Sequence, residues 1–293
     1  MDFRVRPFLS GLLLRLDAAR RLGVRPVGLL LSHRLRTATG LSRHALPDLP
    51  PAEGPFLPDG HPTVPAALQA EALPVLLAVA ELQAPEAGAA SHGPFAPRTH
   101  GLALDLFSAG DVRPVWEANR LGEIPLLALA HRLDPQGGHR DRAEARLAAW
   151  CRANPPFRGP NWACGQEAAL RALHLALAHA LLGGEAAGPG LRTLLAQHRR
   201  RIAATPCYAE AQDNNHTVSE PAGLFACDLL LGEDPAPAMA RLSAALDRLV
   251  VMDGNRIEDF DVEAALSPEP LPSSALPDDP KGRVLNLLDR KSV

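Results

Sequence analysis

The feature that most constrains this sequence is a series of long segments at helical spacing, joined by short links. In each segment apolar residues recur every three to four positions, and the links are rich in Gly, Pro, Asp or Asn. No comparable strand pattern occurs in the sequence. Short loops make antiparallel neighbours the default arrangement of long helices, so we predict an all-α fold of helical hairpins. The segments are 113–133, 141–152, 163–183, 189–204, 217–231 and 236–251.

The N-terminal third has a different pattern. Residues 8–36 predict two more helices, split near Gly23 and Pro26. Residues 45–65 are so rich in proline that we expect a linker or extended arm and no contribution to the core. Residues 66–83 predict a helix interrupted by Pro74.

We therefore expect three regions. Residues 1–60 would hold N-terminal helices and the arm, and residues 61–254 the helical domain. Residues 255–293 would form a divergent tail, because the stretch 267–280 is a low-complexity run of Pro, Ser and Asp that can bury little apolar surface and is expected to be disordered.

Charge and cysteine content limit the function classes. Thirty basic residues against 33 acidic ones give a net charge of −3. This charge argues against a protein that coats nucleic acid or an anionic membrane. No run reaches the roughly 18–20 apolar residues of a membrane span. The basic, partly apolar N-terminus predicts an amphipathic helix, with a signal peptide as the alternative, so localisation stays open. Four scattered cysteines predict free thiols, and no motif predicts a metal or cofactor.

The first segment with unexpected polar residues runs from Asp111 to Arg120. In a continuous helix Arg113, Glu117 and Arg120 share one face, with Trp116 on the same side. One interpretation is a row of surface ion pairs beside a half-buried indole. The other is a sugar-binding platform in which Trp116, Glu117 and Arg120 face the ligand.

The second segment, residues 154–162, links two predicted helices. Asn161 is placed to cap the helix expected to begin at residue 163. The functional interpretation places the amide of Asn161 and the indole of Trp162 at the mouth of a binding groove.

The third segment, residues 213–220, gathers amides, an imidazole and carboxylates before an apolar helix. Helix capping explains part of it, with Asn215 or Thr217 as the cap. The functional interpretation is the rim of an active site. There His216 could take a proton near neutral pH, and Glu220, one turn later, could fix its tautomer.

Three motifs in this order, DVRPVWEANR, NPPFRGPNW and NNHTVSEPAGLF, resemble the heparinase II/III-like polysaccharide lyases over roughly residues 98–254. The resemblance implies an incomplete α/α toroid of antiparallel helical hairpins. In the family a β-sandwich follows the toroid, and this sequence has no counterpart of it.

The resemblance also implies β-elimination at uronic acids in an acidic polysaccharide, of the heparan sulfate or alginate type, in enzymes that often work in the periplasm. By position, Asn215 would neutralise the substrate carboxylate with Asn214 beside it, and His216 would be the base or assist it. The expected groove residues are Trp116, Glu117, Arg120, Asn161, Trp162, Asn214 and Glu220.

The sequence departs from the family after Asp253-Gly254, where members continue with a Tyr-His pair that supplies the catalytic acid. Its one tyrosine, Tyr208, precedes the motif. We therefore expect a truncated or frameshifted lyase-like chain with little activity alone, and a toroid face that a partner chain would cover.

Two alternatives stay open. One is a non-catalytic helical module that binds carbohydrate or a partner. The other is a glycosidase, which needs two carboxylates across the scissile bond, and for it Glu117 and Glu220 are the only nominees.

Overall fold

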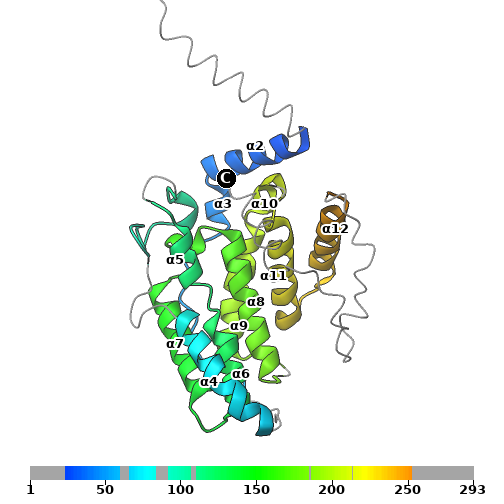
Figure 1. The fold of residues 1–293 in the computed structure, drawn as a ribbon. Helices are drawn as coiled ribbons and strands as arrows, with labels where there is room; N and C mark the ends of the chain where they lie inside the picture. The colour runs from blue at the N-terminus through cyan, green and yellow to red at the C-terminus, as the bar shows by residue number, and fades with distance from the viewer. Residues whose placement is uncertain are drawn as a thin grey trace, which may run out of the picture. The chain divides into compact units, whose positions relative to one another are not determined.

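The computed structural model describes residues 24–59, 66–83, 92–106, 110–184, 186–212 and 214–252, and among these the fold is all-α (Figure 1). The one β-type pairing in this part of the chain is an isolated antiparallel bridge between His100 and Arg158. Two short 3₁₀ turns, η1 (Gly101–Ala103) and η2 (Pro160–Trp162), lie between helices. The α-helices are α2 (Val24–Ala38), α3 (Leu41–His44), α4 (Ala66–Gln83), α5 (Arg113–Ala118), α6 (Glu123–Leu133), α7 (His139–Ala153), α8 (Gly165–Leu181), α9 (Pro189–Ala203), α10 (Pro206–Gln212), α11 (His216–Leu231) and α12 (Ala236–Met252).

Most predicted segments appear as helices close to their expected ends, but the helix expected over 113–133 is divided. Its first part, α5, stops at Ala118, and α6 begins only at Glu123. Between them Leu121 has a φ of 60°, a backbone conformation that a continuous right-handed helix does not contain. Arg120 therefore does not share a helical face with Arg113 and Glu117, and that part of the prediction was wrong.

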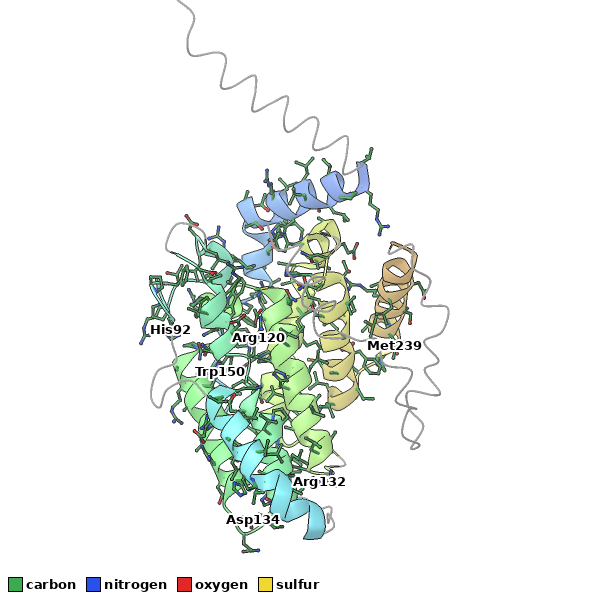
Figure 2. The ribbon with its side chains drawn as sticks, in the orientation of Figure 1. His92, Arg120, Arg132, Asp134, Trp150 and Met239 are labelled. Carbon is green, nitrogen blue, oxygen red and sulfur yellow. The ribbon has the colours of Figure 1, made fainter. Side chains whose placement is uncertain are left out.

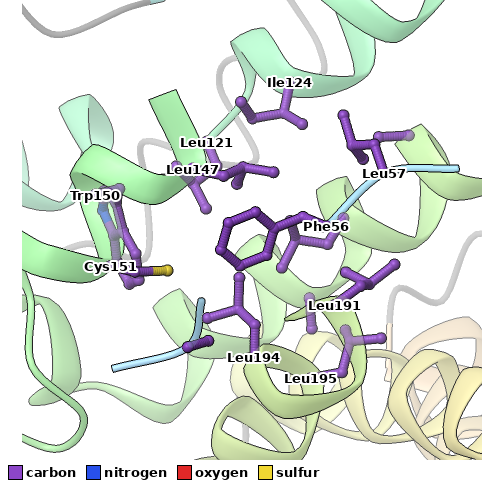
Figure 3. Packing of buried hydrophobic residues seen from close by; sticks show 14 of the residues in the cluster. Phe56, Leu57, Leu121, Ile124, Leu147, Trp150, Cys151, Leu191, Leu194 and Leu195 are labelled. Atoms are coloured by element: carbon purple, nitrogen blue, oxygen red, sulfur yellow. The ribbon is translucent and has the colours of Figure 1, made fainter. Parts of the chain in front are cut away.

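The proline-rich arm is part of the core, which contradicts the expectation of an external linker. Phe56 is fully buried and lies among Leu121, Leu147 and Leu194, as Figure 3 shows. Leu46, Ala52 and Leu57 from the same arm are also buried. An extended segment can contribute to the core without any helical period. Burial of each large apolar side chain contributes about 1.5–3 kcal/mol of stabilising free energy.

Polar contacts hold the arm against the helices. The carboxylate of Glu144 in α7 accepts hydrogen bonds from the backbone N–H groups of Phe56 (2.8 Å) and Leu57 (2.5 Å). Arg140 donates to the carbonyls of Leu57 (2.9 Å) and Pro58 (3.0 Å). These contacts satisfy backbone groups that lie outside any helix and would otherwise be buried without partners.

Helix α8 is central to the packing, since α6, α9 and α11 all lie against it (Figure 1). The crossing with α11 is close because Gly223 faces Ala169. A Cβ on Gly223 would come within 2.5 Å of the Cβ of Ala169. Glycine is therefore required at this crossing, which places the middle of α11 against the second turn of α8.

The chain divides into two compact units, Met1–Ala245 and Leu246–Val293, so α12 begins in one and ends in the other. The helix expected before residue 23, the Asp253-Gly254 turn and the tail expected to be disordered lie outside the described residues. Within the described residues no helix is long and apolar enough to cross a membrane.

Candidate functional site

The first predicted segment forms α5 and the turn after it. Asp111 accepts hydrogen bonds from the backbone N–H (3.0 Å) and the guanidinium (2.9 Å) of Arg113. Trp116 is half-buried, and its indole N–H donates to the carbonyl of Pro160 (2.9 Å) in the second segment. The indole is therefore held in place by a hydrogen bond while part of its ring stays accessible.

Arg120, labelled in Figure 2, comes directly before the α5–α6 turn at Leu121. Its guanidinium makes a bidentate pair with Glu167 of α8, with both N–O distances at 2.9 Å. Glu167 is buried, and the hydrogen bonds to it raise the pKa of Arg120. Such fork-to-fork pairing fixes the guanidinium geometrically. No local pattern indicated Glu167 as the partner of Arg120, because the two residues are 47 positions apart.

Arg120 and Glu117 line a cleft of about 540 Å³ that also contacts Gln83 and His174. His174 is fixed there, because its Nδ1 lies 2.7 Å from the carbonyl oxygen of Arg120. Glu117 is exposed. The cleft thus presents an ionised carboxylate next to a guanidinium that is already paired, within the size range of small-ligand pockets.

The second predicted segment is buried. Trp162 is 1% exposed, and Asn161 is fully buried in η2. The amide of Asn161 donates to the side-chain oxygen of Asn154 (2.8 Å), and the indole of Trp162 donates to the carbonyl of Asn154 (3.1 Å). Helix α8 begins later than expected, at Gly165, so Asn161 does not cap it. Both side chains can support a groove, but neither can line one.

Two buried arginines hold this segment in place. Arg171 donates to the carbonyl of Asn161 (2.6 Å), and Arg201 donates to the carbonyls of Trp162 (2.6 Å) and Ala163 (2.5 Å). Burial lowers the pKa of Arg171 to about 10, which still leaves it charged at neutral pH. The turn that carries the second motif is therefore fixed from the α8 and α9 sides.

His198 completes this buried polar cluster. Its Nδ1–H donates to the carbonyl of Leu194 (2.8 Å), and its Nε2 accepts from Nε of Arg171 (3.1 Å). Burial, and then the charge of Arg171, lower the pKa of His198 to about 3. The imidazole is neutral, and both of its nitrogens are occupied, so it serves structure and not proton transfer.

The third predicted segment starts α11. The side-chain oxygen of Asn214 accepts a hydrogen bond from the backbone N–H of His216 (3.0 Å). The backbone carbonyl of Asn214 accepts a second hydrogen bond from the hydroxyl of Thr217. Asn214 therefore makes the side-chain capping hydrogen bond at the start of α11. Asn215 makes no such bond and is exposed. The amide of Asn215 is accessible to a ligand beside the first turn of the helix.

His216 and Glu220 form an ion-pair geometry one turn apart. Nδ1 of His216 lies 2.9 Å from Oε1 of Glu220, and the side chains are 11% and 4% exposed. A carboxylate without a proton can only accept, so in a neutral imidazole this contact places the proton on Nδ1 and leaves the lone pair on Nε2. The contact itself is the one through which Glu220 was expected to fix the tautomer of His216.

A close contact joins the third segment to the first residue of α8, which follows the second segment by three positions. A Cβ on Gly165, that first residue, would lie 2.6 Å from Oε1 of Glu220. The absence of a side chain at Gly165 therefore allows Glu220 its position under His216. The Trp116–Pro160 hydrogen bond joins the first and second segments directly, whereas the third segment meets the start of α8.

Tyr208 was set aside in the sequence because it precedes the third segment, but it lies against that segment in the structure. Its ring meets His216 edge-on, with the ring centroids 6.2 Å apart, and also lies 4.8 Å from the ring of His33 in α2. Tyr208 is the only tyrosine in the sequence. It belongs to the separate short helix α10, so no helical or strand spacing connects it with His216.

Three further sequence predictions concern the Glu117–Glu220 pair, the cysteines and metal binding. Glu220 does not line the cleft of about 540 Å³ that contains Glu117. All four cysteines are free, and burial raises the pKa of Cys164 to about 11. Within the described ranges no group of three His, Cys, Asp or Glu side chains could hold a metal ion.

Comparison with protein-family models, with curated proteins and with solved structures found no match for this chain. The class of protein that the fold defines is an all-α protein built from packed helices.

Proposed function

We propose that this chain carries the helical part of a polysaccharide lyase-like site that acts by β-elimination on glycans containing uronic acid, such as heparan sulfate or alginate. We further propose that its helices are hairpins of an incomplete α/α toroid. The observation that carries the proposal is the His216–Glu220 pair with the exposed amide of Asn215 next to it and Tyr208 against the imidazole.

Each group has a role in the proposed reaction. The amide of Asn215 donates to the substrate carboxylate and so stabilises the charge that develops when the proton at C5 leaves. Nε2 of His216 takes that proton, and Glu220 stabilises the imidazolium. The electrons form a double bond between C4 and C5 while the bond from C4 to the glycosidic oxygen breaks. In this chain Tyr208, whose ring lies against His216, would take the place of the family's acid after Asp253-Gly254 and supply the proton that the leaving oxygen needs. Because its position in the sequence differs from that of the family tyrosine, we still expect low turnover by the chain alone.

The remaining residues fit binding. Glu117 and Arg120 would contact the sugar chain at the cleft of about 540 Å³, and the half-buried indole of Trp116, which does not line that cleft, would offer the chain a stacking face. Asn161 and Trp162 would support the groove from below, since both are buried. Asn214 would hold the first turn of α11 so that Asn215 and His216 keep their positions.

The test is turnover of uronate-containing oligosaccharides, followed by the ultraviolet absorbance of the unsaturated product. We expect His216→Ala to lower turnover by about 10²–10⁴-fold, the usual contribution of a general base. Asn215→Asp, which places a negative charge against the substrate carboxylate, and Tyr208→Phe should also lower turnover. The exposed His44→Ala is the matched control and should leave turnover unchanged. Equal turnover in His216→Ala and His44→Ala would contradict the proposal.

The second candidate is a non-catalytic module that binds an acidic glycan or a partner chain. The cleft beside Glu117 and Arg120 favours it, because this cleft does not include His216 or Glu220. Saturable binding of an acidic oligosaccharide, without an unsaturated product and with loss in Arg120→Ala, would identify this function.

A further inference from the structure

A second groove lies along the solvent-facing side of α9. It has a volume of about 780 Å³ and is floored by small residues of α9, among them Ala196 and Ala203. The end of α11, at Leu231 and Glu233, forms one wall, and Ala45 after α3 lies on the other. None of the residues that line it belongs to the three predicted segments.

Three arginines of α9 face this groove, namely Arg192, Arg199 and Arg200. Arg192 donates to the carbonyl of Leu231 (3.0 Å), Arg199 pairs with Asp228, and Nε of Arg200 donates to the carbonyl of Ala45 (2.7 Å). These bonds fix the guanidinium groups but do not use all five donors that each one carries. Pre-positioned guanidinium groups favour carboxylate, sulfate and phosphate.

The spacing of the arginines indicates an elongated ligand. Arg192 and Arg200 are eight residues apart, which is about 12 Å along a helix axis. One small anion cannot contact both positions, whereas a chain with two or more anionic groups can. The small side chains of Ala196 and Ala203 leave room for such a chain to lie along the helix.

The other polar groups narrow the chemistry further. Glu233 is an acceptor that needs a donor and repels a chain made of anions alone. The oxygen of Thr193 can accept a further hydrogen bond while it donates to the carbonyl of Pro189 (2.9 Å). No aromatic ring lines the described groove, so it lacks the stacking surface that single-stranded nucleic acids use. A ligand with both anionic groups and hydroxyls matches this lining.

We propose that the α9 groove binds an oligosaccharide that carries carboxylate or sulfate groups, as a site separate from His216. The ligand class rests on the proposed function, while the groove itself does not. The groove would hold a neighbouring stretch of an acidic glycan chain and would add affinity without taking part in bond cleavage.

The experiment measures binding of a short sulfated or uronate-containing oligosaccharide to the full chain by titration calorimetry. We expect Arg200→Ala to weaken binding by about three- to tenfold, the effect of losing one hydrogen bond of ordinary strength at a solvent-exposed position. Ala196→Glu, at an exposed position of α9, should weaken it more by placing a carboxylate on the floor of the groove. The control is Arg152→Ala, which removes the same charge from an exposed position of α7 and should have no effect.

The probes separate the possible ligands, and the variants separate the two sites. A neutral oligosaccharide of equal length and inorganic tripolyphosphate should both bind more weakly than the acidic oligosaccharide. Binding in His216→Ala should persist, so a failed lyase assay would leave this site standing. Unchanged binding in Arg200→Ala and Ala196→Glu, equal loss in Arg152→Ala, or preference for tripolyphosphate would overturn the proposal.

Discussion

Two regions of this molecule use the same kinds of side chain for different purposes. In the buried cluster around Trp162, His198 has both ring nitrogens occupied, and burial lowers its pKa to about 3. At the start of α11, His216 has one nitrogen held by Glu220 and lies where its ring is partly exposed. A histidine with two partners in a buried site stabilises the fold, whereas one with a single partner at a surface can exchange a proton.

The arginines of α9 show the same contrast on one helix. Arg201 is buried and donates to the carbonyls of Trp162 and Ala163. Its neighbour Arg200 is exposed and faces the α9 groove. Since consecutive helical residues point about 100° apart, one arginine serves the core and the next is available to a ligand.

The contrast between buried and exposed side chains predicts its largest effect on the free energy of unfolding, at the buried Arg171. Arg171→Ala should lower the free energy of unfolding by about 3–5 kcal/mol. The reason is that it leaves Nε2 of His198 and the carbonyl of Asn161 without a donor and opens a cavity beside Trp150 and Trp162. Denaturant unfolding measures the change. Arg171→Met, which fills most of the volume, should cost less. A loss under about 1 kcal/mol in Arg171→Ala would show that the cluster does not stabilise the fold.

A smaller effect is expected in the pH dependence of stability. His198 has a folded pKa of about 3, below its ordinary value of 6.5, so between these values the unfolded chain binds the additional proton. Stability should therefore be complete above about pH 6.5 and fall as the pH drops toward 3.

Urea unfolding at several pH values measures this slope. The matched variant His198→Gln keeps an acceptor for Arg171 but cannot titrate, so its slope should be shallower than that of the unaltered chain. Identical slopes would show that His198 does not contribute to the acid sensitivity.

Gly165→Ala should change stability least of the three variants. It should, however, clearly change the contact between His216 and Glu220. The added Cβ would displace the carboxylate of Glu220 from His216, and misplacement by about 1 Å can cost 10–100-fold in turnover. Unfolding should change by under about 1 kcal/mol, because alanine favours the helix more than glycine does. Gly28→Ala, where a Cβ meets nothing within 4 Å, is the control. The imidazole NMR signals of His216 should change in Gly165→Ala alone.

Much of the local structure could be predicted from the sequence, because helix ends depend on nearby residues. The ends of α7, α9, α11 and α12 lie within two residues of their predicted positions. The His216–Glu220 contact was also predictable, since residues four apart on a helix are neighbours. The break between α5 and α6 was not, because it depends on the positive φ of Leu121 and on the pairing of Arg120 with Glu167.

The sequence by itself determined the all-α class and the approximate positions of most helices, since these follow from periodicity and local hydrogen bonding. Only the tertiary structure decided that Phe56 of the proline-rich arm enters the core, that Trp162 is buried and Trp116 is not, and that Tyr208 lies against His216. The physical reason is that burial and long-range contacts depend on how helices pack, and no local pattern records which distant side chains meet.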